Sequence, residues 1–348
     1  MLRGTAMLAI AALALVLAFA FTFTNGFQNA GAMAATFITS RSASPRQGIL
    51  LVSIMGFAGA LLGGTAVALT IAGLLTLPPE ELLIWIVLLA LLSAALWNLM
   101  TWRYGMPTSS THGLIGGLIG AGVASAGIGS IDWGVEELLS SDPHLAGVVK
   151  VVFFLVLTVL VGFIGGYALR VSTRLLLRNA PRKANRTLVG VNWAAAAAMA
   201  FTSGANDAQK QMGVIAIVLL ASGISAGPTV PLWARFGCAV LLALGTLGGG
   251  WRVMATLGRR IFRIQPVHSL DSQVSSGAII ALATLAGAPV STTHVISTSV
   301  IGVGAAENPL KVRWLVGTQI LVTMLVTIPA TACLAALLHL VLSPFLGI

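Results

Sequence analysis

Charged side chains are scarce in this sequence: Asp, Glu, Lys and Arg together make up 8% of its 348 residues. A soluble globular domain has about 25% charged residues, because its surface faces water. Hydrophobic residue types, by contrast, make up 57% of the chain, and the mean hydropathy is +0.98. This composition excludes a soluble globular protein and indicates a membrane protein.

Cysteines are few, and nucleotide-binding motifs are missing. The two cysteines, Cys238 and Cys333, lie inside apolar runs, where they cannot form a disulfide framework or a metal cluster. The sequence contains neither a P-loop nor a glycine-rich turn between a strand and a helix. We therefore expect no enzyme activity, no membrane-embedded phosphotransfer chemistry and no bound cofactor.

The net charge of +10 comes from 19 basic and 9 acidic residues that alternate in clusters along the chain. Basic clusters lie at 41–46, 170–186 and 252–263, and acidic clusters lie at 80–81 and 132–142. Loops rich in Lys and Arg face the cytoplasm, so this alternation reports topology and not nucleic-acid binding. It predicts a bacterial plasma or inner membrane protein with both termini and the acidic loops outside and the basic loops inside.

Apolar runs long enough to cross a membrane, which takes about 20 residues, recur through the chain. They lie at about 6–40, 48–72, 82–102, 104–126 and 147–169, and again at about 188–222, 231–251, 267–286, 289–306 and 313–345. The runs at 6–40, 188–222 and 313–345 are longer than helix tilt readily absorbs, so we expect them to be broken or re-entrant. The sequence thus predicts an all-α polytopic membrane protein with about 10–12 transmembrane or re-entrant helices.

Two polar motifs inside the apolar sequence each occur twice. The first copies are Asn25-Gly26-Phe27-Gln28-Asn29-Ala30 and Pro107-Thr108-Ser109-Ser110-Thr111-His112, and the second copies are Ser203-Gly204-Ala205-Asn206-Asp207-Ala208-Gln209-Lys210 and Pro289-Val290-Ser291-Thr292-Thr293-His294. Their separations nearly agree, at 207 − 29 = 178 and 294 − 112 = 182, which indicates a duplication of half the chain. We interpret 1–169 and 188–348 as two repeats joined by a basic cytoplasmic loop at 170–187.

The second repeat is expected to have the opposite orientation in the membrane. Each half contains five predicted crossings, and an odd number makes the second half enter from the other side. Inverted repeats with helices broken at mid-membrane are typical of secondary transporters, whereas a channel or a membrane enzyme gives no reason for the pairing.

The motifs that run from proline to histidine predict an anion site. Proline suits the first turn of a helix, and a helix that starts inside the membrane directs free N–H groups and a positive dipole end at the residues before it. Hydroxyl donors lie at both starts: Thr108, Ser109, Ser110 and Thr111 in the first copy, and Ser291, Thr292 and Thr293 in the second. Two such ends, related by a pseudo-two-fold axis, would enclose a tetrahedral oxyanion. His112 and His294 close the motifs and are candidate proton or anion ligands.

Asp207 and Lys210 are ionisable residues on a membrane span, where a charge is costly and usually faces a pathway or a partner. Oxygen-bearing side chains around Asp207 suit a cation such as sodium. The candidate cation ligands are Asp207, Asn206, Asn29, Gln28 and Asn25, and Gln209 and Lys210 are candidate anion ligands. The alternative interpretation is that Asp207 and Lys210 form a purely structural ion pair.

At these motifs the sequence resembles the inorganic phosphate transporter (PiT) family over nearly the whole chain. The matching segments are Ser40-Arg41 with Ser44 to Gln47, Trp97-Asn98 with Tyr104 to His112, Ser203 to Gly213, and Pro289 to His294 with Gly302 to Gly304. In this order and spacing they are highly specific. The resemblance implies transport of inorganic phosphate across a membrane.

Three positions depart from the family pattern. The family usually carries Asp at the position of Asn29, an amide or carboxylate near Gly56, and Glu near Gln273. The resemblance therefore implies fewer cation or proton ligands in this chain, with Asp207 and Asp271 as its intramembrane acids.

These observations predict a cation-coupled phosphate symporter that works by alternating access, with H+ or Na+ as the co-transported ion. Coupling is needed because the inside-negative potential opposes phosphate entry by about 2.3 kcal/mol per charge per 100 mV. A sulfate permease of the same fold and a passive anion channel stay open as alternatives. Asp207 favours phosphate, because it can accept a hydrogen bond from a protonated phosphate oxygen. The expected partners are phosphate and the lipid bilayer, and association into homo-oligomers is left open.

Overall fold

The computed structural model describes residues 2–104, 106, 108–181, 183–249 and 262–346, which are helical almost throughout. The helices are α1 (Leu2–Thr39), α2 (Pro45–Leu62), α3 (Ala66–Ala72), α4 (Glu81–Arg103), α5 (Ser110–Ala126), α6 (Val135–Leu138), α7 (Gly147–Leu176), α8 (Ala184–Ala221), α9 (Leu232–Gly248), α11 (Pro266–Leu285), α12 (Thr292–Glu307) and α13 (Trp314–Leu346), with short 3-10 turns at Ile128–Ser130 and Pro309–Lys311. Within these ranges no β-strand occurs, so the prediction of an all-α protein is confirmed. Six of the described helices are long and apolar enough to cross a membrane.

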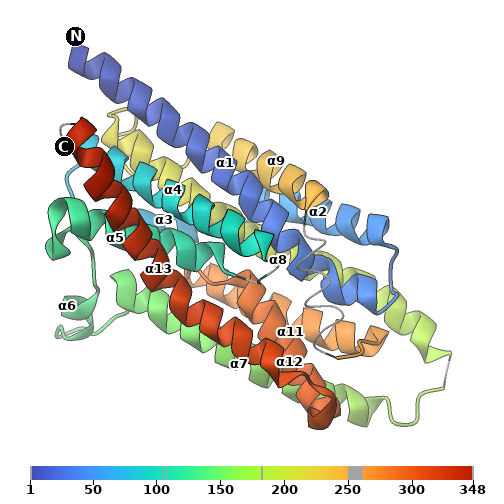
Figure 1. Cartoon of the computed structure of the whole chain (residues 1–348). Coiled ribbons are helices and arrows are strands. Elements are labelled where there is room, and N and C mark those ends of the chain that lie inside the picture. The colour runs from blue at the N-terminus through green and yellow to red at the C-terminus, as the bar shows by residue number, and fades with distance from the viewer. Residues whose placement is uncertain (1, 105, 107, 182, 250–261, 347–348) are drawn as a thin grey trace.

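The predicted breaks in the three longest apolar runs are wrong. Helices α1 and α8, with 38 residues each, and α13, with 33, are continuous. A helix satisfies its own backbone hydrogen bonds inside the bilayer, and at 1.5 Å per residue a 38-residue helix is about 57 Å long. A tilt, together with ends that extend beyond the hydrocarbon layer, is expected to accommodate this length. Helix α1 runs along the molecule from its N-terminal end without a break (Figure 1).

The chain instead reverses inside the molecule at two helical hairpins. Helix α5 (17 residues) packs back along α4, and α12 (16 residues) packs back along α11. The N-terminal residues of α5 and α12 are buried, and both hairpin tips lie near the middle of the molecule (Figure 1). The segments predicted as crossings at 104–126 and 289–306 are therefore the returning arms of hairpins that enter from opposite ends.

The two halves of the chain exchange packing partners reciprocally. The most extensive contacts between the halves join α7 with α12, α5 with α13, α2 with α8, and α1 with α9. In chain order, α1, α2, α5 and α7 of the first half correspond to α8, α9, α12 and α13 of the second. The contact of α5 with α13 is then equivalent to that of α12 with α7, and the contact of α1 with α9 is equivalent to that of α8 with α2. The same two packing arrangements thus occur twice in one molecule.

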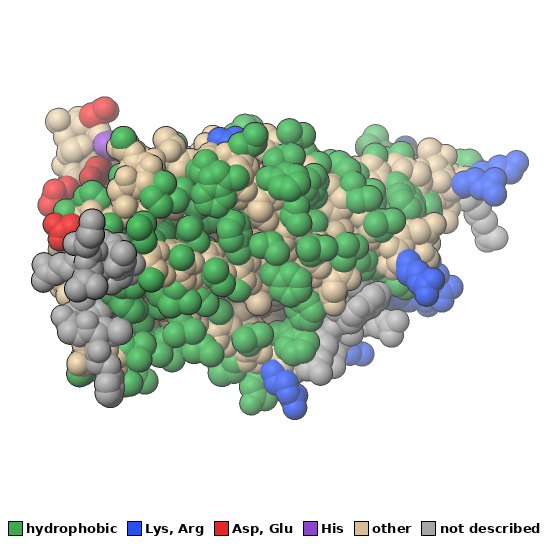
Figure 2. Space-filling view, turned by 90° about the horizontal axis from the view of Figure 1, so that it is seen from above, with side chains coloured by type: hydrophobic (Ala, Val, Ile, Leu, Met, Phe, Trp, Pro, Cys, Tyr) green, Lys and Arg blue, Asp and Glu red, His purple; other side chains and the backbone are tan. Residues whose placement is uncertain are grey.

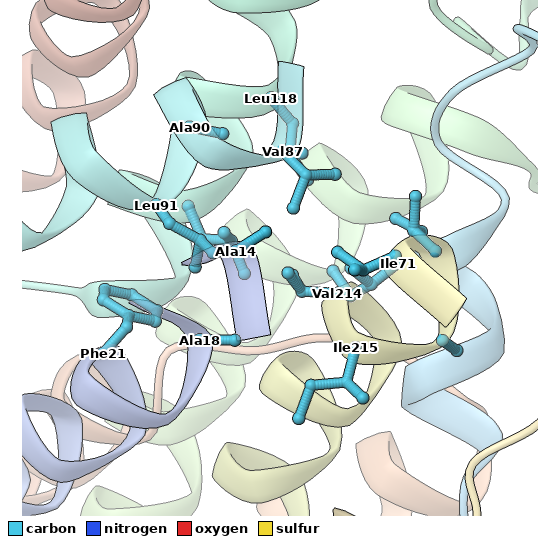
Figure 3. Packing of buried hydrophobic residues seen from close by; sticks show 14 of the residues in the cluster. Ala14, Ala18, Phe21, Ile71, Val87, Ala90, Leu91, Leu118, Val214 and Ile215 are labelled. Atoms are coloured by element: carbon cyan, nitrogen blue, oxygen red, sulfur yellow. The ribbon is translucent and has the colours of Figure 1, made fainter. Parts of the chain in front are cut away.

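The apolar core is built largely from small and branched side chains. Figure 3 shows Ala14 and Ala18 of α1, Ile71 of α3, Val87 of α4 and Val214 of α8 converging in it. Small residues let membrane helices approach closely and gain dispersion contacts, which is the main source of association where lipid is as apolar as the core.

The charges separate to the two ends of the molecule. Both termini lie at one end together with α6, which carries Glu136 and Glu137 (Figure 1). Acidic side chains gather at one end of the surface, and Lys and Arg lie mainly towards the other (Figure 2). This separation agrees with the topology predicted from the loop charges, although Arg252, Arg259 and Arg260 of the third basic cluster lie outside the described residues.

Cysteine labelling tests that topology. We expect a membrane-impermeant thiol reagent to modify Ser141→Cys but not Asn179→Cys in intact cells, because these exposed positions lie at opposite ends of the protein. The background is Cys333→Ser, since Cys333 is exposed whereas Cys238 is buried. Permeabilised cells should allow both sites to react, and labelling of Asn179→Cys in intact cells would reverse the orientation.

Candidate functional site

Two helices start at the centre of the protein, and serine residues cap both of them. The hydroxyl of Ser109 accepts a hydrogen bond from the backbone N–H of His112 at 3.2 Å, and Ser291 accepts one from His294 at 3.4 Å. The expectation that α12 has proline in its first turn is wrong, because Pro289 precedes the cap in extended chain. Serine provides the acceptor oxygen that a free N–H needs at this position. Pro107, its counterpart before α5, lies outside the described residues.

Residues at equivalent positions of the two polar motifs meet each other. The amide of Asn29 on α1 donates a hydrogen bond to Asp207 Oδ2 on α8 at 2.8 Å. The rings of His112 and His294 are in edge contact, with centroids 5.1 Å apart. Both pairs are buried. The two halves therefore contact each other through the same positions, as they would on either side of a two-fold axis.

Asp207 is the centre of the polar network. Lys210 Nζ lies 2.7 Å from Asp207 Oδ1, and the hydroxyl of Thr292 donates to both carboxylate oxygens, at 3.2 and 3.0 Å. Lys210 also donates to the carbonyl oxygen of Val290 at 2.7 Å. Both charged residues are only 1% exposed. An ion pair this deeply buried needs such additional hydrogen bonds, because it has lost the solvation of water.

Four of the predicted hydroxyl residues belong to this network, and Thr108 bonds elsewhere. Besides Thr292, Ser110 donates to Asn25 Oδ1 at 2.6 Å, and Thr293 donates to Asn29 Oδ1 at 2.9 Å. Thr111 donates to the carbonyl oxygen of Val290 at 3.0 Å. Thr108, by contrast, lies 3.2 Å from the hydroxyl of Thr327 on α13.

Asn206 and Gln209 bond to backbone groups outside the network. Asn206 donates to the carbonyl oxygen of Ala288 at 3.1 Å and accepts from the backbone N–H of Val290 at 3.3 Å. Gln209 donates to the carbonyl oxygen of Gly63 and accepts from the N–H of Val67, both at 2.8 Å. These two amides hold the segment before α12 and the break between α2 and α3, and so position the elements around the site.

Several buried polar atoms near the network have no hydrogen-bond partner among the described residues. Both amide atoms of Gln28 and of Asn98, Nδ1 of His112 and both ring nitrogens of His294 are of this kind. Gln28 and Asn98 border a cavity of about 200 Å³ between α1 and α4. Burial of an unpaired polar group costs about 1–3 kcal/mol, so these atoms are expected to pair with water or a ligand. The sequence analysis assigned no role to Asn98, although a polar amide on an otherwise apolar membrane helix is costly and therefore indicates a partner or a ligand.

Asp271 belongs to a different cluster. Its carboxylate accepts a hydrogen bond from Thr173 at 2.9 Å and lies 3.5 Å from Arg170, which also binds Glu307 at 2.7 Å. This cluster joins α7, α11 and the end of α12. The second intramembrane acid predicted from the sequence is therefore paired with an arginine and is separate from Asp207.

The fold and the buried polar site define the class of protein: a polytopic membrane transporter. The sequence pattern of the phosphate transporter family matches residues 25–335, and the chain belongs to this family. It is a member of a family of transporters and not an enzyme. The resemblance found from the motifs is thus confirmed.

Proteins of known sequence and structure agree with this assignment. The chain is 35% identical to a probable low-affinity inorganic phosphate transporter of Bacillus subtilis (strain 168), over 92% of this chain and 93% of that protein. It is 36% identical to a protein of the same description from Mycobacterium tuberculosis (strain ATCC 25618 / H37Rv), over 90% of this chain and 73% of that protein. A solved structure described as the sodium-dependent phosphate transporter shares the fold, with a TM-score of 0.81, 23% identity, and coverage of 97% of this chain and 99% of that chain.

Proposed function

We propose that this chain is a cation-coupled inorganic phosphate symporter of the bacterial plasma membrane that works by alternating access. Family membership and the descriptions of its relatives support phosphate as the substrate. The observation that carries the proposal is the convergence of two buried helix N-termini, at Ser110 and Thr292, on the buried pair of Asp207 and Lys210.

Phosphate is held, in this proposal, between the ends of α5 and α12. Free backbone N–H groups and the positive dipole ends of both helices favour an anion there. The hydroxyls of Ser110, Thr292 and Thr293 donate to Asn25, Asp207 and Asn29 in the structure, and in this proposal they turn to the bound oxyanion. Asp207 accepts a hydrogen bond from a protonated phosphate oxygen, which distinguishes phosphate from sulfate.

Alternating access follows from two inverted repeats, at 1–169 and 188–348, joined by the basic segment 170–187, which comprises the end of α7, a short connection and the start of α8. The reciprocal packing of α5 with α13 and of α12 with α7 supports this division. Each hairpin reaches the centre from a different end of the protein (Figure 1). Movement of one hairpin at a time would therefore open the site to one side of the membrane while the other stays closed.

Coupling to H+ or Na+ is required by the charge of the substrate. Phosphate carries one to two negative charges at neutral pH, and each is opposed by about 2.3 kcal/mol per 100 mV of inside-negative potential. A passive anion channel would not accumulate phosphate against this potential.

Reconstitution into proteoliposomes tests the proposed function. Labelled phosphate or sulfate is offered with a proton gradient or a sodium gradient imposed separately. Phosphate accumulation driven by either ion supports a symporter. Preferential accumulation of sulfate would make the protein a sulfate permease, and flux that only equilibrates in both gradients would make it a channel.

Removal of one hydroxyl from the site is expected to weaken phosphate binding. Ser110→Ala and Thr292→Ala each remove a donor to a charged ligand, a loss of about 1.5–3 kcal/mol, which corresponds to about ten- to a hundredfold in affinity. The measurement is phosphate affinity from concentration-dependent uptake. Ser125→Ala is the control, because that serine on α5 bonds to the carbonyl oxygen of Ala121, outside the network. Wild-type affinity in both variants would refute the hydroxyl site.

A further inference from the structure

We propose that the side-chain ammonium of Lys210 is a built-in cation that occupies the place of sodium beside Asp207, so that transport does not require sodium at this site. The inference rests on the proposed phosphate transport and adds that sodium bound at Asp207 does not drive this transport. It departs from the sequence-based assignment of sodium to Asp207 and of Lys210 to the anion.

The contacts of Lys210 are those of a cation in an oxygen-lined site. Its Nζ lies 2.7 Å from Asp207 Oδ1 and 2.7 Å from the carbonyl oxygen of Val290. One oxygen is a carboxylate and the other a backbone carbonyl, which are the oxygen types that bind hard cations. The two oxygens come from α8 and from the segment before α12, so the ammonium joins the two elements.

The carboxylate of Asp207 already has a cation at its Oδ1 atom and neutral donors around it. Oδ1 accepts from Lys210 and Thr292, and Oδ2 accepts from Asn29 and Thr292. The four distances come from three donor groups, because the single hydroxyl hydrogen of Thr292 is shared between the two oxygens. The position between Oδ1 and the carbonyl oxygen of Val290 is the one that Lys210 occupies. A sodium ion could take that position only by displacing Lys210, and it would then face a second positive charge at close range in a buried environment.

Lys210 cannot move away to make room by a small rotation. It lies one helical turn from Asp207 on the same face of α8 and is 1% exposed. An ammonium without a partner inside a membrane protein is costly, which keeps the pair together. A lysine is also tethered to the helix, so its positive charge stays with the protein and is not carried across the membrane with the substrate.

The solved structure with the same fold is described as a sodium-dependent phosphate transporter, and that description applies to that protein. At 23% identity the likeness extends to the fold. The residues around Asp207 in this chain do not fit sodium, because the position between the carboxylate and the Val290 carbonyl is filled by the chain itself.

The first test compares uptake by wild-type protein in proteoliposomes at a fixed proton gradient, in sodium and in choline medium. We expect equal rates within twofold. A loss of at least tenfold in choline would overturn the inference while leaving phosphate transport intact. Absence of phosphate accumulation under every gradient would instead reject the proposed function.

The second test vacates the site with Lys210→Ala. Sodium is expected to raise the thermal midpoint of the purified variant and to restore part of the uptake that the substitution removes, whereas it leaves the midpoint of the wild type unchanged. The double variant Lys210→Ala with Asp207→Ala should lose the sodium-induced shift. Lys150→Ala is the matched control, because that lysine on α7 binds Thr70 and not Asp207.

Two results would overturn the inference. One is a sodium-induced shift of equal size in wild type and Lys210→Ala, and the other is no shift in a folded Lys210→Ala protein. If Lys210→Ala does not fold, Lys210→Gln takes its place, and the wild-type comparison decides by itself: sodium stimulation of wild-type uptake overturns the inference and sodium independence supports it.

Discussion

Asp207→Asn is expected to abolish coupled phosphate uptake. The substitution leaves the ammonium of Lys210 buried without its counter-charge, and breaking one partner of a buried ion pair costs about 3–5 kcal/mol. It also replaces a carboxylate that accepts from Lys210, Thr292 and Asn29 by an amide with a single acceptor oxygen. Uptake in proteoliposomes and the thermal midpoint of the purified variant measure the two consequences separately.

Asn29 supplies the matched comparison for Asp207. Asn29→Ala removes one hydrogen bond to the carboxylate, a loss of about 1.5–3 kcal/mol, together with the neutral bonds to Asn25 and from Thr293. The ion pair of Asp207 with Lys210 stays in place, so uptake should weaken but persist. Asn29→Asp places a second carboxylate beside Asp207 and should therefore add a dependence on an external cation. The double variant of Asp207→Asn with Lys210→Gln removes both charges. If it transports phosphate with unchanged ion dependence, Asp207 and Lys210 are only a structural pair.

Gly204→Val is expected to prevent stable folding of the transporter. A Cβ atom at Gly204 on α8 would collide with the carbonyl oxygen of Gly56 on α2 and lie 2.6 Å from its Cα atom. Backbone atoms cannot turn aside as a side chain can, so α2 and α8 would have to separate. Overpacking of a core costs about 1–3 kcal/mol where side chains can adjust, and we expect the upper end of that range or more here.

The thermal midpoint and the yield of monodisperse protein measure this effect. Gly190→Ala is the control on the same helix, because nothing lies within 4 Å of the position of its Cβ atom. Alanine favours a helix over glycine by about 1 kcal/mol, so this variant should be as stable as the wild type or more so. A Gly204→Val protein with wild-type stability and uptake would contradict the close contact of α2 with α8.

The transporter class and the position of the site could be predicted from the sequence, because both depend on local properties. Scarcity of charge and long apolar runs require helices in a membrane, and the alternating loop charges orient them. The doubled motifs at Asn29 and Asp207, and at His112 and His294, are brought together in the structure, and polar groups within apolar runs are too costly to occur without a role.

The course of the chain around that centre was decided only by tertiary packing. Length suggested breaks in α1, α8 and α13, yet these helices are continuous and the reversals lie between α4 and α5 and between α11 and α12. Run length cannot distinguish a crossing from the arm of a hairpin, because both are apolar helices. Whether an apolar helix crosses the membrane or is the arm of a hairpin depends on which other helices pack around its end.

The partners of the polar side chains were likewise set by the fold. Neighbouring residues of one motif have different roles: Asn206 and Gln209 bind backbone groups, while Asp207 and Lys210 form the central pair. A one-residue step on a helix turns a side chain by about 100°, towards a different neighbour. Composition and spacing determined that this protein carries polar groups inside a membrane, and the packing of α8 against α1, α2 and the segment before α12 decided that Lys210 contacts both Asp207 and the carbonyl oxygen of Val290.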